Sequence, residues 1–261
     1  MRLRCKPVHQ TTLVSLTVLA LLLGCGSATA ATIGISDNFN DNSLNPSLWA
    51  PAIIGDGVVS EVNQRLETTI LASPAHSTSS AFAGVALVGT IGGDFDVSVR
   101  YELLVPLPLS HGDTAGLILV GEEFGVFGYG VGRDVHTLWS GTEWVLGNAY
   151  VAAVGGGEEV TATQDISGQV RLTRVGASFS AYYWAGSGWQ LIAAGTGSTD
   201  PMSLALGTTI LGPELVSIAF DDFSLTADQF TPPIPEPATL LLLGAGLAAT
   251  AVVRRRMKKR T

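Results

Sequence analysis

Apolar and polar residues alternate along many short segments between residues 31 and 233, and helical spacing is missing there. In residues 94–102 every second residue is apolar: Phe95, Val97, Val99 and Tyr101. Successive side chains of a strand point to opposite faces. This segment therefore predicts a strand with Phe95, Val97, Val99 and Tyr101 in a core and Asp96, Ser98, Arg100 and Glu102 on the opposite face.

Runs of β-branched and aromatic residues, separated by Gly, Asp, Asn or Ser about every ten residues, predict further strands. These runs are 80–88, 115–120, 125–131, 145–154, 169–175, 178–184, 189–194, 203–210 and 216–226. A hairpin turn is expected at 175–178, where Gly176 is free to adopt a positive φ. The pattern predicts one all-β domain over residues 31–230, long enough for one sandwich or one barrel.

The first thirty residues have the three parts of a secretory signal peptide. A basic segment, 1–6, precedes an apolar segment, 13–23, and Ala28-Thr29-Ala30 is a cleavage site for signal peptidase of the general secretion machinery. An alternative is lipidation at Cys25, in Leu22-Leu23-Gly24-Cys25. Both cysteines, Cys5 and Cys25, lie in this segment, so ordinary cleavage leaves no disulfide and no thiolate metal site.

The last part of the chain, 231–261, also has three parts. Ile234-Pro235-Glu236-Pro237-Ala238-Thr239 is followed by an apolar run over 238–253 and a basic tail over 254–260. As a helix, the run would span about 24 Å, close to the thickness of a hydrocarbon core. Its basic flank favours the cytoplasmic side, so this transmembrane segment places the body of the protein outside.

This tail resembles the PEP-CTERM sorting signal of Gram-negative bacteria, with Pro235, Glu236 and Pro237 as the sorting motif. The resemblance implies processing by an exosortase during export to the cell surface or the extracellular polysaccharide matrix. A simple C-terminal anchor is the alternative. It accounts for the apolar run and the basic tail but not for the two prolines, which keep the backbone extended.

Removal of both ends leaves a strongly acidic body. Between residues 31 and 233 there are five arginines, no lysine and 21 acidic residues, a net charge of −16. Such a surface repels nucleic acid and anionic lipid, so neither is an expected partner, and membrane contact is expected only through the C-terminal segment before processing.

Three pieces of the body share a second resemblance. They are the opening segment 37–49 (DNFNDNSLNPSLW), the hairpin 171–183 (RLTRVGASFSAYY) and the closing segment 220–225 (FDDFSL). Together they resemble concanavalin A-like lectin/glucanase (laminin-G-like) jelly rolls. The resemblance implies that the first and last strands pair. Another antiparallel sandwich, such as an immunoglobulin-like one, is the alternative.

Catalytic residues are not evident in the pattern. Glycoside hydrolases of the resembled fold place two carboxylates on one strand, as Glu-x-Asp-x-x-Glu or Glu-x-Asp-x-Glu, and the chain lacks this spacing. Asp94 and Asp96 share a face but fit a solvated outer face better than a catalytic pair. His76, His111 and His136 are scattered singly, so no zinc or copper site is predicted.

Carbohydrate binding has more support, because aromatic residues gather in the middle third of the chain. Tyr182, Trp184, Trp139 and Trp144 are the candidates, since sugar rings stack on aromatic faces. The alternative for each is ordinary core packing. We therefore expect an exported surface or matrix protein that binds carbohydrate without catalysis. A secreted polysaccharide hydrolase or lyase, and a purely structural surface protein, are the alternatives.

A structural calcium ion is the one expected cofactor. Oxygen donors crowd the segment from Asp37 to Asn42, and Asp221 and Asp222 bring more in the closing strand. Asp37 and Asp222 are the preferred carboxylate ligands. The alternative is that these Asp and Asn residues serve only the turns that they favour.

Overall fold

The computed structural model describes residues 32–109, 115–121 and 128–232 of the chain. All of them belong to one compact unit that starts at Thr32. No helix among these residues is long and apolar enough to cross a membrane. The predicted signal peptide, the sorting motif with Pro235, Glu236 and Pro237, and the predicted transmembrane segment 238–253 lie outside the described residues.

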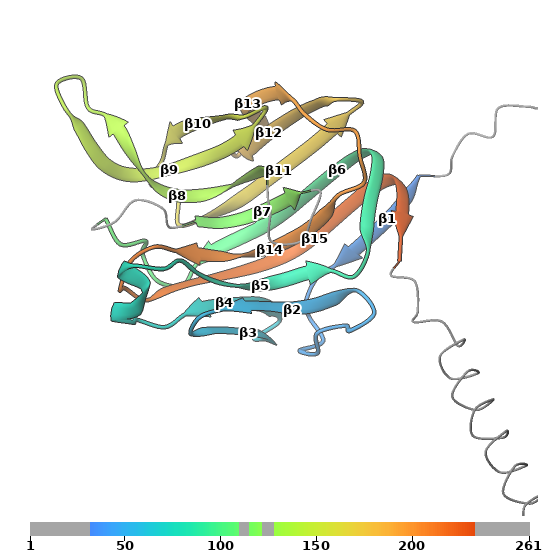
Figure 1. Cartoon of the computed structure of the whole chain (residues 1–261), viewed down its shortest axis with the longest axis horizontal. Coiled ribbons are helices and arrows are strands. Elements are labelled where there is room, and N and C mark those ends of the chain that lie inside the picture. Colours follow the sequence, from blue (N-terminus) through green and yellow to red (C-terminus); the bar gives the residue numbers. More distant parts are fainter. Residues whose placement is uncertain (1–31, 110–114, 122–127, 233–261) are drawn as a thin grey trace, which may run out of the picture. The chain divides into compact units, whose positions relative to one another are not determined.

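Two antiparallel sheets face each other across a core, as Figure 1 shows. Sheet A has the order β13-β12-β11-β6-β15-β4-β3, with β1 on β15. Its strands are β1 (Ile33–Asp37), β3 (Gly57–Val62), β4 (Arg65–Ile70), β6 (Thr90–Leu103), β11 (Ser167–Val175), β12 (Ser178–Trp184), β13 (Trp189–Thr196) and β15 (Val216–Thr231). The all-β fold that the alternation predicts and the antiparallel sandwich that the resemblance implies are both confirmed.

Sheet B has the order β10-β9-β8-β7-β14-β5-β2. Its strands are β2 (Trp49–Ile54), β5 (Ala81–Leu87), β7 (Ala115–Gly121), β8 (Tyr129–Trp139), β9 (Trp144–Val154), β10 (Gly157–Ala162) and β14 (Ser203–Ile210). The described residues contain one helical turn, η1 (Pro74–Ser77). Figure 1 shows the β8–β9 hairpin as a long curved arm of this sheet.

The last strand, β15, organises sheet A. One of its edges pairs with β6, from Ile218 to Thr231. Its other edge pairs first with β4 and then with β1, where Asp37 lies opposite Phe223. The expected pairing of the first and last strands is therefore confirmed. The pairing of β15 with β6 shifts register between Asp221 and Ser224, and Asp222 takes a positive φ of 48° there.

The core follows the alternation of the strands. Phe95, Val97, Val99 and Tyr101 of β6 are buried against sheet B, as predicted. Phe179 of β12 packs between Phe95, edge to face, and Tyr129, with which it stacks at 4.0 Å between ring centroids. The predicted turn is also present, with Gly176 at a φ of +58° between β11 and β12.

The strand predicted over 125–131 is correct for residues 129–131 but wrong at its C-terminal end, because the strand continues to Trp139. Tyr129 to Trp139 form β8, and residues 125–127 lie outside the described part of the chain. The second half of β8 has no run of apolar residues that would predict a strand, because it contains the polar residues Arg133, Asp134, His136 and Thr137. Arg133 and Asp134 are nevertheless buried: Arg133 donates to the Asp165 carbonyl at 2.9 Å, and Asp134 Oδ1 accepts a hydrogen bond from the neighbouring Val135 amide at 2.7 Å.

Val97→Asp should lower the free energy of unfolding by more than about 3 kcal/mol, because it places an unpaired carboxylate among fully buried side chains. Ser98→Asp, on the opposite face of the same strand, should change it by about 0.5 kcal/mol or less. Thermal melts of the two purified variants make the comparison. Equal losses of stability would contradict the register of β6.

Candidate functional site

An ion pair lies on the outer face of sheet A. The Arg171 guanidinium on β11 donates from Nε to Asp96 Oδ1 of β6 at 2.8 Å, and its Nη2 donates to the second carboxylate oxygen. These hydrogen bonds with Asp96 raise the pKa of Arg171, so the guanidinium stays protonated. Two parallel hydrogen bonds fix both side chains in one orientation.

Two aromatic rings flank this ion pair. The guanidinium carbon of Arg171 lies 5.6 Å from the ring centroids of both Tyr182 on β12 and Trp189 on β13. We call Asp96, Arg171, Tyr182 and Trp189 the Arg171 surface. Two hollows of 340 Å³ each open on it, and their shared lining residues are Asp96, Arg171 and Thr226.

The four aromatic residues predicted to bind carbohydrate fall into two groups. Tyr182 belongs to the Arg171 surface. Trp184 is 37% exposed, and its ring lies nearly perpendicular to that of Trp189, with the two ring centroids 5.4 Å apart. Trp139 and Trp144 pair with each other at the end of the β8–β9 hairpin in sheet B, 56% and 67% exposed. Among the described residues, no ring contact joins the two groups.

The sequence pattern does not single out Asp96, Arg171 or Trp189 as a binding site. The only available signal is that Asp96, Arg171 and Tyr182 occupy the polar-face positions of three strands. Which strands are neighbours depends on the order β12-β11-β6, and this order joins segments about 75 residues apart in the chain.

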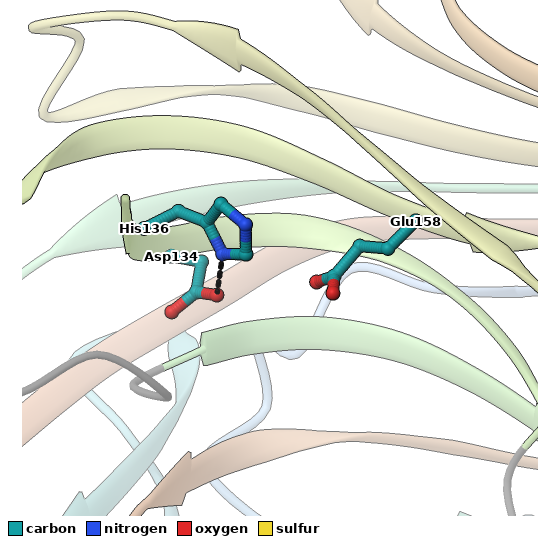
Figure 2. Close-up of side chains that lie close together, drawn as sticks. All are labelled: Asp134, His136 and Glu158. Atoms are coloured by element: carbon teal, nitrogen blue, oxygen red, sulfur yellow. Dashed lines mark ion pairs between the residues drawn. The ribbon is translucent and has the colours of Figure 1, made fainter. Parts of the chain in front are cut away.

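A mixed cluster of Asp134, His136 and Glu158 lies on sheet B and is shown in Figure 2. Asp134 and His136 come from β8, and Glu158 comes from β10. The ligand atoms of the three side chains lie within 4.8 Å of one another. His136 is therefore not the isolated histidine that its place in the sequence indicates. Its spacing from Asp134 puts both on one strand face, but nothing in the sequence relates them to Glu158.

The residues predicted to bind calcium already have protein partners. Asp37 Oδ1 accepts a hydrogen bond from the Phe39 amide, and Oδ2 accepts one from Trp49 Nε1, both at 2.9 Å. Asp222 Oδ2 accepts one from Arg100 Nη1 at 3.2 Å. Both aspartates are thus held by the fold, and the calcium site at this junction stays a prediction.

Glu61 on β3 adds an unexpected carboxylate near Asp37. It is 6% exposed, and its Oε1 has no hydrogen-bond partner within the described structure. Burial, and then the neighbouring carboxylates of Asp41 and Asp37, raise the pKa of Glu61. A buried acid with a raised pKa is less stable when ionised, and a cation among these carboxylates would reverse that effect.

One protein-family match covers the C-terminal part of the chain. Residues 233–256 match the PEP-CTERM protein-sorting motif, so the resemblance seen in the tail is confirmed. The motif implies export toward the cell surface and processing by an exosortase. No curated protein matches the chain.

Solved structures share the sandwich fold. A lectin from Bauhinia forficata in complex with GalNAc superposes with a TM-score of 0.50 at 9% identity, covering 76% of this chain and 100% of its own. The CBM2 module of the evolved Dit of Lactobacillus casei BL23 phage J-1 has a TM-score of 0.50 at 11% identity, covering 78% and 98%. These likenesses establish that the body is a jelly-roll β-sandwich, as the resemblance implies.

Glu61→Gln should raise the melting temperature at pH 7 in the presence of a chelator, and the gain should shrink toward pH 4. The folded-state pKa of Glu61 lies above its unfolded value, so its contribution to stability is present below the unfolded pKa and is lost as the pH rises through the folded pKa. The Gln side chain of the variant does not ionise, so the variant does not lose this stability as the pH rises.

The exposed Glu143→Gln is the matched control and should change little at either pH. Millimolar calcium should stabilise the wild type and not Glu61→Gln if an ion binds among these carboxylates. A lower melting temperature for Glu61→Gln in chelator at pH 7 would contradict the assignment.

Proposed function

We propose that this protein is an exported, exosortase-processed surface or extracellular-matrix protein that binds a neutral polysaccharide, without catalysis, through the Arg171 surface. The observation that supports the binding site is the Asp96–Arg171 ion pair between two aromatic rings, beside hollows of 340 Å³. Hollows of this size lie within the range of small-ligand sites.

A sugar ring has apolar C–H faces and a rim of hydroxyl groups, and the Arg171 surface offers a partner for each. The rings of Tyr182 and Trp189 can stack on the C–H face. Asp96 can accept hydrogen bonds from hydroxyl groups, because a carboxylate has about four acceptor positions and Arg171 uses only part of them. Since the ion pair orders both side chains before binding, little entropy is lost when the glycan arrives.

The charges favour a neutral glycan over an acidic one. Asp96 neutralises the guanidinium of Arg171, so the site presents no net positive charge. The body between residues 31 and 233 carries 21 acidic residues against five arginines, and its field repels anions at a distance. A polysaccharide of neutral hexoses needs no positive charge for binding and is not repelled by the acidic body.

The ends of the chain support the proposed location. The signal peptide over 1–30 would direct the chain to signal peptidase, and the sorting segment would hold it in the inner membrane until an exosortase acts at the motif. The proposed destination is the surface or polysaccharide matrix of a Gram-negative bacterium. Residues 31–233 are rich in carboxylates and contain no lysine, which suits a domain that stays soluble among neutral polymers.

Tyr182→Ala and Trp189→Ala should each weaken binding of a neutral glycan about tenfold, because each removes a stacking face worth about 1 kcal/mol or more. A glycan array identifies the ligand, and titration calorimetry with that ligand measures the change. Trp144→Ala, which removes an exposed aromatic ring from sheet B, is the matched control and should bind normally.

The controls separate the alternatives. Loss of binding only in Trp144→Ala would move the site to the β8–β9 hairpin. Release of reducing sugar from the bound glycan would show an enzyme and contradict binding without catalysis. Absence of any glycan ligand would favour a structural surface protein.

Glu236→Ala should leave the full-length chain in the inner membrane, whereas the wild-type surface protein should lack residues 238–261. Thr231→Ala, an exposed residue just before the motif, should be processed normally. Mass spectrometry of the surface fraction measures both outcomes. An exported wild-type protein with an intact 254–260 tail would rule out processing at this motif.

A further inference from the structure

A second site lies on sheet B, on the face turned away from the core. Asp134 and His136 are two residues apart on β8, so both side chains emerge on the same face. That face is the outer one, because the alternating residues Val131 and Val135 belong to the core. This site is separate from the Arg171 surface, which lies on sheet A.

Glu158 reaches this pair from β10, on the far side of β9. The β9 residues opposite His136 and Asp134 are Gly147 and Ala149. Opposite Glu158 itself is Ala153. Val151 lies between Ala149 and Ala153 on the same face of β9, and the Glu158 carboxylate still comes within 4.8 Å of the ligand atoms of both β8 residues. Figure 2 shows the Glu158 carboxylate turned toward the imidazole of His136.

The distances fit a shared metal ion. Asp134 Oδ2 and His136 Nδ1 are 3.7 Å apart, and all three ligand atoms lie within 4.8 Å of one another. Two ligands of a tetrahedral zinc ion at about 2.1 Å are about 3.4 Å apart. The distance between Asp134 Oδ2 and His136 Nδ1 is therefore close to the distance between two ligands of one zinc ion. A small rotation of the long Glu158 side chain would bring its carboxylate in as the third ligand.

The surroundings also suit an ion. Asp134 is 5% exposed, and its Oδ1 accepts a hydrogen bond from the Val135 amide at 2.7 Å, which orients the carboxylate as outer contacts do in metal sites. His136 is half-buried and Glu158 is exposed, so an ion can enter from solvent.

We propose that Asp134, His136 and Glu158 bind a divalent transition-metal ion, with Zn²⁺ as the preferred ion. The imidazole ligand favours zinc over calcium or magnesium, which prefer oxygen donors. Three protein ligands leave one tetrahedral position for water or another small ligand from solvent. This site goes beyond glycan binding on the Arg171 surface and does not depend on it.

Titration calorimetry of the tag-free full chain in detergent with Zn²⁺ tests the site. The background carries Cys5→Ser and Cys25→Ser, because these are the only two thiols of the chain. We expect one equivalent of Zn²⁺ to bind and to raise the melting temperature. His136→Gln and Glu158→Gln should each weaken zinc binding at least tenfold, as expected when a ligand is lost.

Glu159→Gln is the matched control, because Glu159 is the next residue of β10 and points to the other face. It should bind zinc like the wild type, and Ca²⁺ should not compete with zinc at equal concentration. Melts in chelator show that each variant is folded before zinc is added. No zinc binding by a folded wild type, or equal loss in Glu159→Gln and Glu158→Gln, would overturn the proposal.

Discussion

The pairing of β15 with β6 is the constraint on which the rest of the structure depends. It joins residues 218–231 to residues 90–103, and it places both strands in the middle of sheet A. Every other sheet A strand is added outward from this pair, β11 to β13 on one side and β1, β3 and β4 on the other. A slip of one residue in β6 would turn Val97 to solvent and Asp96 into the core. The register of β6 therefore determines both the packing of Val97 in the core and the ion pair of Asp96 with Arg171 on the outer face.

Three large buried polar side chains, Arg174, Tyr101 and Tyr150, find hydrogen-bond partners where the two sheets meet. Arg174 on β11 points into the interior, two rings pack against it, and its Nε and Nη1 donate to the carbonyls of Gly93 and Asp200, each at 2.8 Å. Tyr101 donates to the Tyr150 hydroxyl at 2.9 Å, which donates to Asp165. Burial raises the pKa of both tyrosines, so their hydroxyls stay protonated and act as donors. A buried network of this kind favours one arrangement of the strands over others, because any other would leave donors without acceptors.

The outer faces of the two sheets differ in character. Sheet A carries larger polar and aromatic side chains around Arg171, which suit a ligand that both stacks and forms hydrogen bonds. On sheet B, the Glu158 carboxylate comes within 4.8 Å of the ligand atoms of Asp134 and His136, two strands away across β9. One sandwich thus presents two surfaces of different chemistry, and the acidic body and the sorting tail make both suited to the cell exterior. Neither surface requires the other to form.

The sequence by itself determined the strand alternation of β6, the turn at Gly176 and the sorting motif at 233–256, because these depend on residues that are close together in the chain. It also pointed to Tyr182 and Trp184, since alternation alone separates them from the buried Phe179. Only the tertiary structure decided that Arg171 meets Asp96 and Trp189, that Glu158 reaches His136, and that Glu61 is buried beside Asp37 and Asp41. These contacts depend on strand order and sheet curvature. Both arise from burial of the core as a whole, which no local pattern encodes.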